Sequence, residues 1–235
     1  MVDAVARSSR LMVLADVARS TGAGHERRWP ATLTVAAVLG LQLAMPRQVM
    51  AGPGWLLPTL EVALLAPIAA SNPVRLSRDT PWLRGAALTL TGLLAAANAM
   101  HLVRLVIVLV SGDPTDPRLL VQAALLIWIT NVAAAGLAFW EMDRGGPFAR
   151  DPRHARPNGR PDLLFPQMSG VSGWDAAAWR PTFTDYLFVA FTTATAFSPT
   201  DTMPLSPRAK LLMTATASVS LLTLAVVAAR AVNVL

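Results

Sequence analysis

The stretch "RGAALTLTGLLAAANAMHLVRLVIVLV", residues 84–110, decides the fold class because it is long, apolar and almost free of charge. A bilayer hydrocarbon core about 30 Å thick needs roughly 20 helical residues to cross it. Residues 84–110 satisfy that length, so the sequence predicts a transmembrane helix here. Further apolar blocks of helical length lie on both sides of it, at residues 31–45, 55–71, 118–140 and 209–235. We therefore expect an all-α integral membrane protein.

The composition agrees with this fold class and excludes several functions. Charged residues make up 14% of the chain, whereas soluble domains contain about 25%. The net charge of +6 comes from arginines that lie between the apolar blocks. They do not cluster on one basic helix, so no nucleic-acid partner is predicted. The chain has no cysteine, which excludes disulfides and thiolate metal sites.

The apolar blocks and the arginines divide the chain into four parts. We expect a basic cytoplasmic segment (1–30), a four-helix membrane region (31–140), a polar cytoplasmic linker (141–181) and a final unit (182–235). Arginines are frequent in the N-terminal segment, in the loop before residue 84 and in the linker. Because arginine-rich short loops stay in the cytoplasm, the pattern predicts a multi-pass protein of the cell membrane with a cytoplasmic N-terminus.

The final unit contains "FTTATAFSPTDTMP", residues 191–204, between an aromatic-rich run and the last apolar block. Four preceding crossings leave residue 141 on the inside, so this segment enters from the cytoplasm. If it turns back, the protein has five transmembrane helices plus a re-entrant segment; if it crosses, there are six. The sequence leaves both open. The candidate pore-lining residues are Thr192, Thr193, Thr195, Ser198, Thr200 and Asp201.

A second candidate site is an intramembrane polar cluster of Glu61, Asn98, His101 and Arg104. Glu61 and Arg104 each lie about six residues from the outer end of their segments, which is roughly 9 Å of helical rise. We therefore expect them to form an ion pair between neighbouring helices. Asn98, His101 and Arg104 are spaced to share one helix face. The cluster could be a structural bridge or part of a proton path, and both interpretations stay open.

Residues 191–204 resemble the pore loop of tetrameric potassium channels, T-x-T-T-V-G-Y-G-D-x-x-P. Thr193, Thr195, Asp201 and Pro204 match its threonines, aspartate and proline, whereas residues 198–200, Ser-Pro-Thr, replace its Gly-Tyr-Gly. Filter carbonyls face the ion because glycines tolerate the required backbone. Proline fixes φ and lacks an N–H, so this degenerate filter is not expected to select potassium.

The run "TDYLFVAFTTATAFSPTD", residues 184–201, with the apolar helix after it, also resembles an uncharacterised family of bacterial multi-span membrane proteins. That resemblance implies a bacterial cell membrane and a fold, but no activity. One hypothesis is a channel-like or transport protein, a homo-oligomer in the lipid bilayer with monovalent cations as ligands. The alternative is a non-conducting structural or partner-binding membrane protein. No catalytic, cofactor or metal residues are predicted, and an enzyme is not expected.

Overall fold

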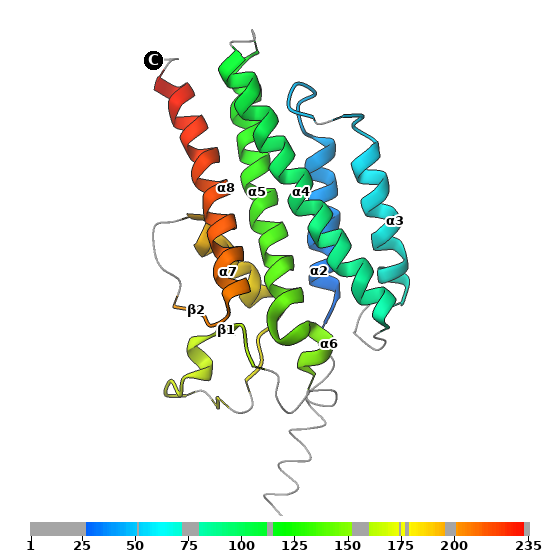
Figure 1. The fold of residues 1–235 in the computed structure, drawn as a ribbon, viewed down its shortest axis with the longest axis vertical. Coiled ribbons are helices and arrows are strands. Elements are labelled where there is room, and N and C mark those ends of the chain that lie inside the picture. The colour runs from blue at the N-terminus through cyan, green and yellow to red at the C-terminus, as the bar shows by residue number, and fades with distance from the viewer. Residues whose placement is uncertain are drawn as a thin grey trace, which may run out of the picture.

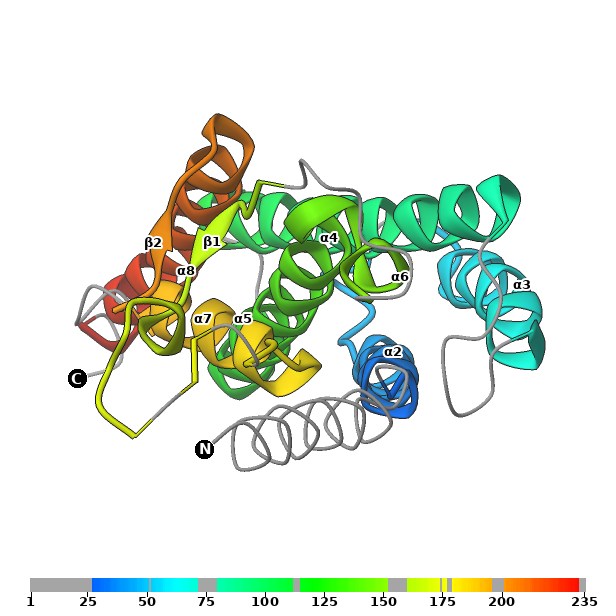
Figure 2. The same ribbon diagram turned by 90° about the horizontal axis from the view of Figure 1, so that it is seen from below.

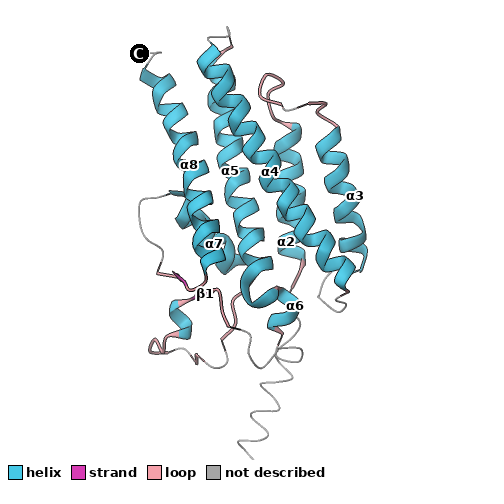
Figure 3. Cartoon of the chain, in the orientation of Figure 1, coloured by secondary structure: helices cyan, strands magenta, loops and turns pink. Residues whose placement is uncertain are grey.

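The computed structural model describes residues 27–50, 52–71, 80–111, 115–151, 160–173, 175–176, 179–195 and 201–232. Most of the predicted N-terminal segment, up to residue 26, lies outside this part. The described chain is mostly helical, as predicted. Figure 3 shows long helices running side by side, with the few non-helical segments gathered mainly at one end.

The helices and strands follow the predicted blocks closely. Their bounds are α2 (Trp29–Leu43), α3 (Leu56–Ser71), α4 (Pro81–Ser111), α5 (Pro117–Met142), η1 (Asp143–Gly145), α6 (Pro147–Arg150), β1 (Leu163–Leu164), η2 (Pro166–Met168), α7 (Phe183–Thr195), β2 (Met203–Pro204) and α8 (Pro207–Val232). Proline opens α5 and α8, where its missing N–H has no intrahelical partner to lose. Asp116 caps α5 by accepting a hydrogen bond from the Arg118 N–H at 2.9 Å.

Three described helices are long and apolar enough to cross a membrane, namely α4, α5 and α8. The remaining apolar helices are shorter: α2 has 15 residues and α3 has 16. At a rise of about 1.5 Å per residue, these two span about 22–24 Å. The membrane-protein class thus rests on α4, α5 and α8, and α2 and α3 are short for the full hydrocarbon thickness.

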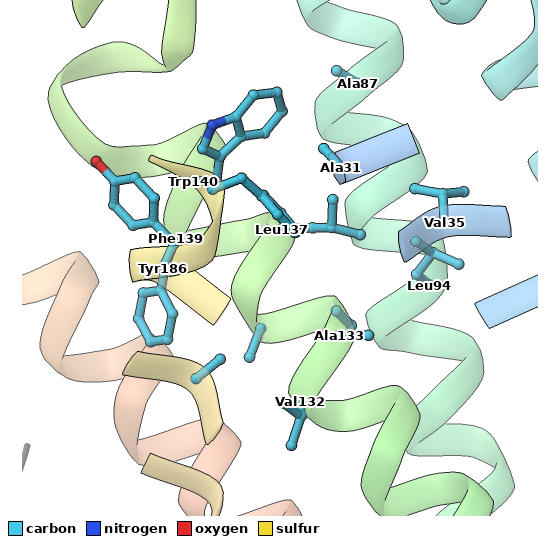
Figure 4. Packing of buried hydrophobic residues seen from close by; sticks show 14 of the residues in the cluster. Ala31, Val35, Ala87, Leu94, Val132, Ala133, Leu137, Phe139, Trp140 and Tyr186 are labelled. Atoms are coloured by element: carbon cyan, nitrogen blue, oxygen red, sulfur yellow. The ribbon is translucent and has the colours of Figure 1, made fainter. Parts of the chain in front are cut away.

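Helix α5 is the centre of the bundle, with α7 and α8 on one side and α2 and α4 on the other (Figures 1 and 2). Its residues 130–137 are all buried. Small side chains allow close packing here: a Cβ on Gly136 would lie 3.2 Å from the Leu187 Cα of α7. Figure 4 shows Leu137 and Trp140 of α5 packed near Ala31 and Val35 of α2.

The predicted linker, residues 141–181, is a folded cap at one end of the bundle in its described part. It contributes η1, α6, β1 and η2. Leu163 is fully buried and Phe165 is 3% exposed. The Phe165 ring packs 5.4 Å from the rings of both Trp179 and Tyr186. This aromatic cluster holds the cap against the first turns of α7.

Candidate functional site

The chain segments before and after helix α7 lie at the same end of the bundle. Strand β1 precedes α7 and β2 follows it, and the two strands pair antiparallel with Leu163 opposite Pro204. The Leu205 N–H also donates a 2.8 Å hydrogen bond to the Asp162 carbonyl. α7 has 13 residues, about 20 Å of rise, and Figure 1 shows it reaching only part-way along α8.

The first turn of α7 is capped by its own residues. Thr182 donates to Asp185 Oδ2 through its backbone N–H at 2.7 Å and its hydroxyl at 2.8 Å. A carboxylate in the first turn also interacts favourably with the positive end of the helix dipole. Asp185 therefore has a structural function at the start of α7, far from the threonines at its other end.

A buried polar network joins α5, α7 and the cap, and Asp143 is its centre. The Asp143 side chain is fully buried. It accepts a 2.6 Å hydrogen bond from the Tyr186 hydroxyl and a 2.8 Å hydrogen bond from the Asp162 N–H. Arg150 donates to the carbonyls of Trp140 at 2.6 Å and Asp143 at 3.0 Å, and its guanidinium lies 4.9 Å from the Tyr186 ring centre.

A second carboxylate, Asp162, ties the cap to the start of α8. Arg208 donates to both Asp162 oxygens at 2.6 Å, and the Arg144 N–H donates to Oδ2 at 3.1 Å. Burial alone would raise the pKa of Asp162, but hydrogen bonds from Arg208, Ser206 and the Arg144 backbone, together with the Arg208 charge, hold that pKa below its ordinary value. The cap is therefore fixed by a charged, bidentate contact.

Neither carboxylate was predicted to have this structural function. Asp143, Asp162 and Tyr186 were not among the predicted site residues. The available signals were a carboxylate directly after a long apolar helix, and the only tyrosine of the chain in the aromatic run. Neither signal identifies its partner, because the contacts form between segments separated by about 20 to 40 residues.

The structure describes three of the predicted pore-lining threonines, and all three lie in the last turn of α7 or just before it. Thr192 donates to Phe188 and Val189 carbonyls, Thr193 to the Val189 carbonyl at 2.7 Å, and Thr195 to the Thr192 carbonyl at 3.0 Å. Each hydroxyl hydrogen is thus used within α7, while each oxygen keeps lone pairs for a further contact.

The other predicted pore-lining residues are Ser198, Thr200 and Asp201. Ser198 and Thr200 fall in residues 196–200, outside the described part of the chain. Asp201 is exposed and lies two residues before β2, which pairs with β1 in the cap. Figure 1 shows β1 and β2 at the end of the bundle that carries the cap.

The hydroxyl residues of α8 pack against α5. Thr216, Ser220 and Thr223 are buried, and the Asn131 side-chain amide donates to the Thr216 carbonyl and the Ser220 hydroxyl, both at 2.9 Å. Thr214 and Ser218 are exposed. This arrangement agrees with the packing function expected of such residues between membrane helices.

Glu61 of the predicted intramembrane cluster has a different partner from the predicted one. Glu61 is fully buried and accepts a 3.0 Å hydrogen bond from the Gln42 amide of α2. Within the described chain no Glu61–Arg104 ion pair forms, and Arg104 is exposed. The expected pair is wrong. Gln42, the lone amide in an apolar block, was missed although its position in "LGLQLAM" was a visible signal.

The helical period explains the error. Asn98 and His101 are buried at 2% and 5% exposure, but each three-residue step turns about 60° short of a full revolution at 3.6 residues per turn. By Arg104 the drift is about 120°, so its side chain leaves the buried face.

Among the described residues, four buried polar atoms around Glu61 and His101 lack a hydrogen-bond partner: Gln42 Oε1, Glu61 Oε2, Asn98 Oδ1 and His101 Nδ1. An adjoining cavity of about 10 Å³, lined by Gln42 and His101, has about the volume that one water needs.

No group of three or more potential metal-binding side chains occurs in the part of the chain that the structure describes. Comparisons with protein-family models, curated proteins and solved structures found no match.

Proposed function

We propose that the protein is a channel-like or transport protein of the bacterial cell membrane that moves monovalent cations as a homo-oligomer. The observation that carries this proposal is the half-length helix α7, which starts at the cap and ends inside the bundle. The return of the chain to the same end through β1 and β2 supports five crossings plus one re-entrant segment. In this proposal the cap and the N-terminus lie in the cytoplasm.

The electrostatics of α7 favour a cation at its end. The C-terminus of a helix has an effective charge of about −0.5, and half-helices in transporters use that end to coordinate Na⁺. Thr192, Thr193 and Thr195 supply hydroxyl oxygens at this end, and oxygen is the ligand that hard cations prefer. The missing filter glycines argue against potassium selectivity.

A single α7 cannot enclose an ion, so the proposal requires several copies of the chain. The surface available for that association is apolar: Phe188 and Phe191 of α7 are 63% and 47% exposed, and Leu211 and Leu221 of α8 are 71% and 62% exposed. Only 17% of the apolar stretch of α8 is buried by the rest of the same chain. This face would contact neighbouring copies, lipid or both.

The alternative is a structural or partner-binding membrane protein that does not conduct. The hydrogen bonds within α7 favour it, because the threonine hydroxyls already donate to carbonyls of their own helix. Proline at position 199, which fixes φ and lacks an N–H, also favours the non-conducting alternative.

Cation flux into liposomes containing the purified full chain separates the two functions. We expect flux of at least one monovalent cation, reduced about tenfold by Thr195→Val, which corresponds to about 1.4 kcal/mol at the barrier. Thr214→Val is the matched control, because Thr214 makes the same hydroxyl-to-carbonyl bond on the exposed face of α8. Absence of flux for every cation at every voltage would contradict the proposal and favour the alternative.

A further inference from the structure

An open cavity of about 1060 Å³ lies on the surface of the cap, between the end of α5 and the start of α8. Three arginines and one carboxylate line it: Arg144, Arg160, Arg208 and Asp162. Arg208 is paired with Asp162 through the bidentate bond, and Arg144 lies 3.8 Å from the buried carboxylate of Asp143, so Arg160 supplies the excess positive charge of the lining. A cavity with this charge favours an anion.

Arg144, which lines the cavity, has an unusual backbone conformation. Its φ of 53° makes it the one non-glycine residue with positive φ in the described chain. Such a conformation costs about 1–2 kcal/mol and occurs preferentially at ligand sites. Arg144 Nε is buried and has no hydrogen-bond partner among the described residues; the nearest carboxylate oxygen, Asp143 Oδ2, is 3.8 Å away. Arg144 Nη2 donates to the Met168 sulfur at 3.6 Å, which is a weak acceptor, so the guanidinium keeps donor capacity at its other nitrogens.

The start of α8 adds to the positive potential. Ser206, Pro207 and Arg208 line the cavity, and they begin a helix of 26 residues whose N-terminus carries the positive end of the dipole. The Ser206 hydroxyl accepts a 3.2 Å hydrogen bond from the Ala209 N–H, which fixes this turn. Guanidinium forks and a helix N-terminus are the groups that bind phosphate most often.

Apolar side chains beside the cavity indicate that the phosphate belongs to a lipid. Leu205 lines the cavity and is 48% exposed, and Leu211, one turn along α8, is 71% exposed. Both lie where a membrane helix leaves the cap, so an acyl chain could follow α8 while the headgroup stays among the arginines. The arginine distribution assigns this end to the cytoplasm, where anionic lipids attract basic pockets.

We propose that this cavity binds the phosphate of an anionic phospholipid headgroup through Arg160 and through the remaining donors of Arg144 and Arg208. The site is independent of cation conduction. Its function would be to hold the cap, and with it the entry of α7, at the membrane surface.

The test is binding of phosphatidylglycerol to the purified full chain in detergent, followed by native mass spectrometry, with phosphatidylcholine as the neutral lipid. We expect phosphatidylglycerol to bind in preference. Arg160→Gln should weaken this binding about tenfold, because a charged hydrogen-bond donor is lost. Arg160 is exposed, so its replacement should leave the melting temperature of the lipid-free protein unchanged.

Arg118→Gln is the matched control, since Arg118 is also exposed but lies at the other end of α5; it should retain wild-type binding. Equal binding of phosphatidylglycerol to the wild type and the Arg160→Gln variant would overturn the proposal. Competition by inorganic phosphate at the same concentration as the lipid would also overturn it, because the site would then recognise a free anion without help from the acyl chains.

Discussion

The Tyr186 hydroxyl donates a 2.6 Å hydrogen bond to Asp143 Oδ2, and this contact links the second turn of α7 to the end of α5. Both side chains are fully buried. The other Asp143 oxygen accepts from the Asp162 N–H, so one carboxylate aligns α7, the central helix α5 and the cap. The depth at which α7 ends depends on this connection.

Tyr186→Phe removes the hydroxyl and leaves a buried carboxylate oxygen without its donor. The free energy of unfolding should fall by about 1–3 kcal/mol, measured by titrating the protein in mixed micelles with a denaturing detergent. In an Asp143→Ala background the same change should cost much less, because the acceptor is gone. Equal costs in the two backgrounds would show that the hydrogen bond does not stabilise the fold.

The Asp162 contact predicts a pH dependence. Because the pKa of Asp162 is lowered in the folded protein from its ordinary value of 3.8, its contribution to stability is complete above pH 3.8 and is lost as the pH falls through the lower, folded value. The melting temperature of the wild type should exceed that of Asp162→Asn at pH 7. This difference should shrink below pH 3.8, and a constant difference down to pH 2.5 would contradict the prediction.

Gly136 makes a third prediction possible. A methyl group there would lie 3.2 Å from the Leu187 Cα and 3.1 Å from its Cδ1, so Gly136→Ala should push α7 away from α5 and cost about 1–3 kcal/mol. Gly92→Ala is the control. Gly92 is also helical, but nothing lies within 4 Å of its added methyl, and alanine has the higher helix propensity. Gly92→Ala should therefore be neutral or stabilising, and a similar loss in both variants would refute the packing argument.

The sequence predicted the apolar helices well, because hydropathy depends on local composition. The block predicted at residues 118–140 became α5, Pro117–Met142, and the block at 55–71 became α3. The contacts between polar side chains were less predictable. The position of Arg104 along α4 follows from counting residues. The direction of its side chain around the helix axis depends on a rotation that accumulates with each residue. For Asp143 and Asp162, the partners come from segments that only the tertiary fold brings together.

The Gln42–Glu61 contact gives a prediction about the packing of α2 against α3. Gln42→Leu leaves the buried Glu61 without the amide that donates to it at 3.0 Å, so the free energy of unfolding should fall by about 1–3 kcal/mol. The double variant Gln42→Leu/Glu61→Leu should recover most of this loss, because replacing both polar partners by apolar groups can be nearly neutral. A double variant less stable than Gln42→Leu would indicate that Glu61 has another stabilising partner.

The re-entrant path of α7 can be tested in cells, because the chain has no native cysteine to interfere. Single cysteines at Ser169 and Asp201, exposed positions before and after α7, should react with a membrane-impermeant thiol reagent from the same side. The arginine distribution predicts that this side is the cytoplasm. Cysteines at Gln48, between α2 and α3, and at Ala229, near the end of α8, are at exposed positions and should react only from the opposite side. If positions 169 and 201 reacted from opposite sides, α7 would cross the membrane, and the pairing of β1 with β2 could not exist in the bilayer.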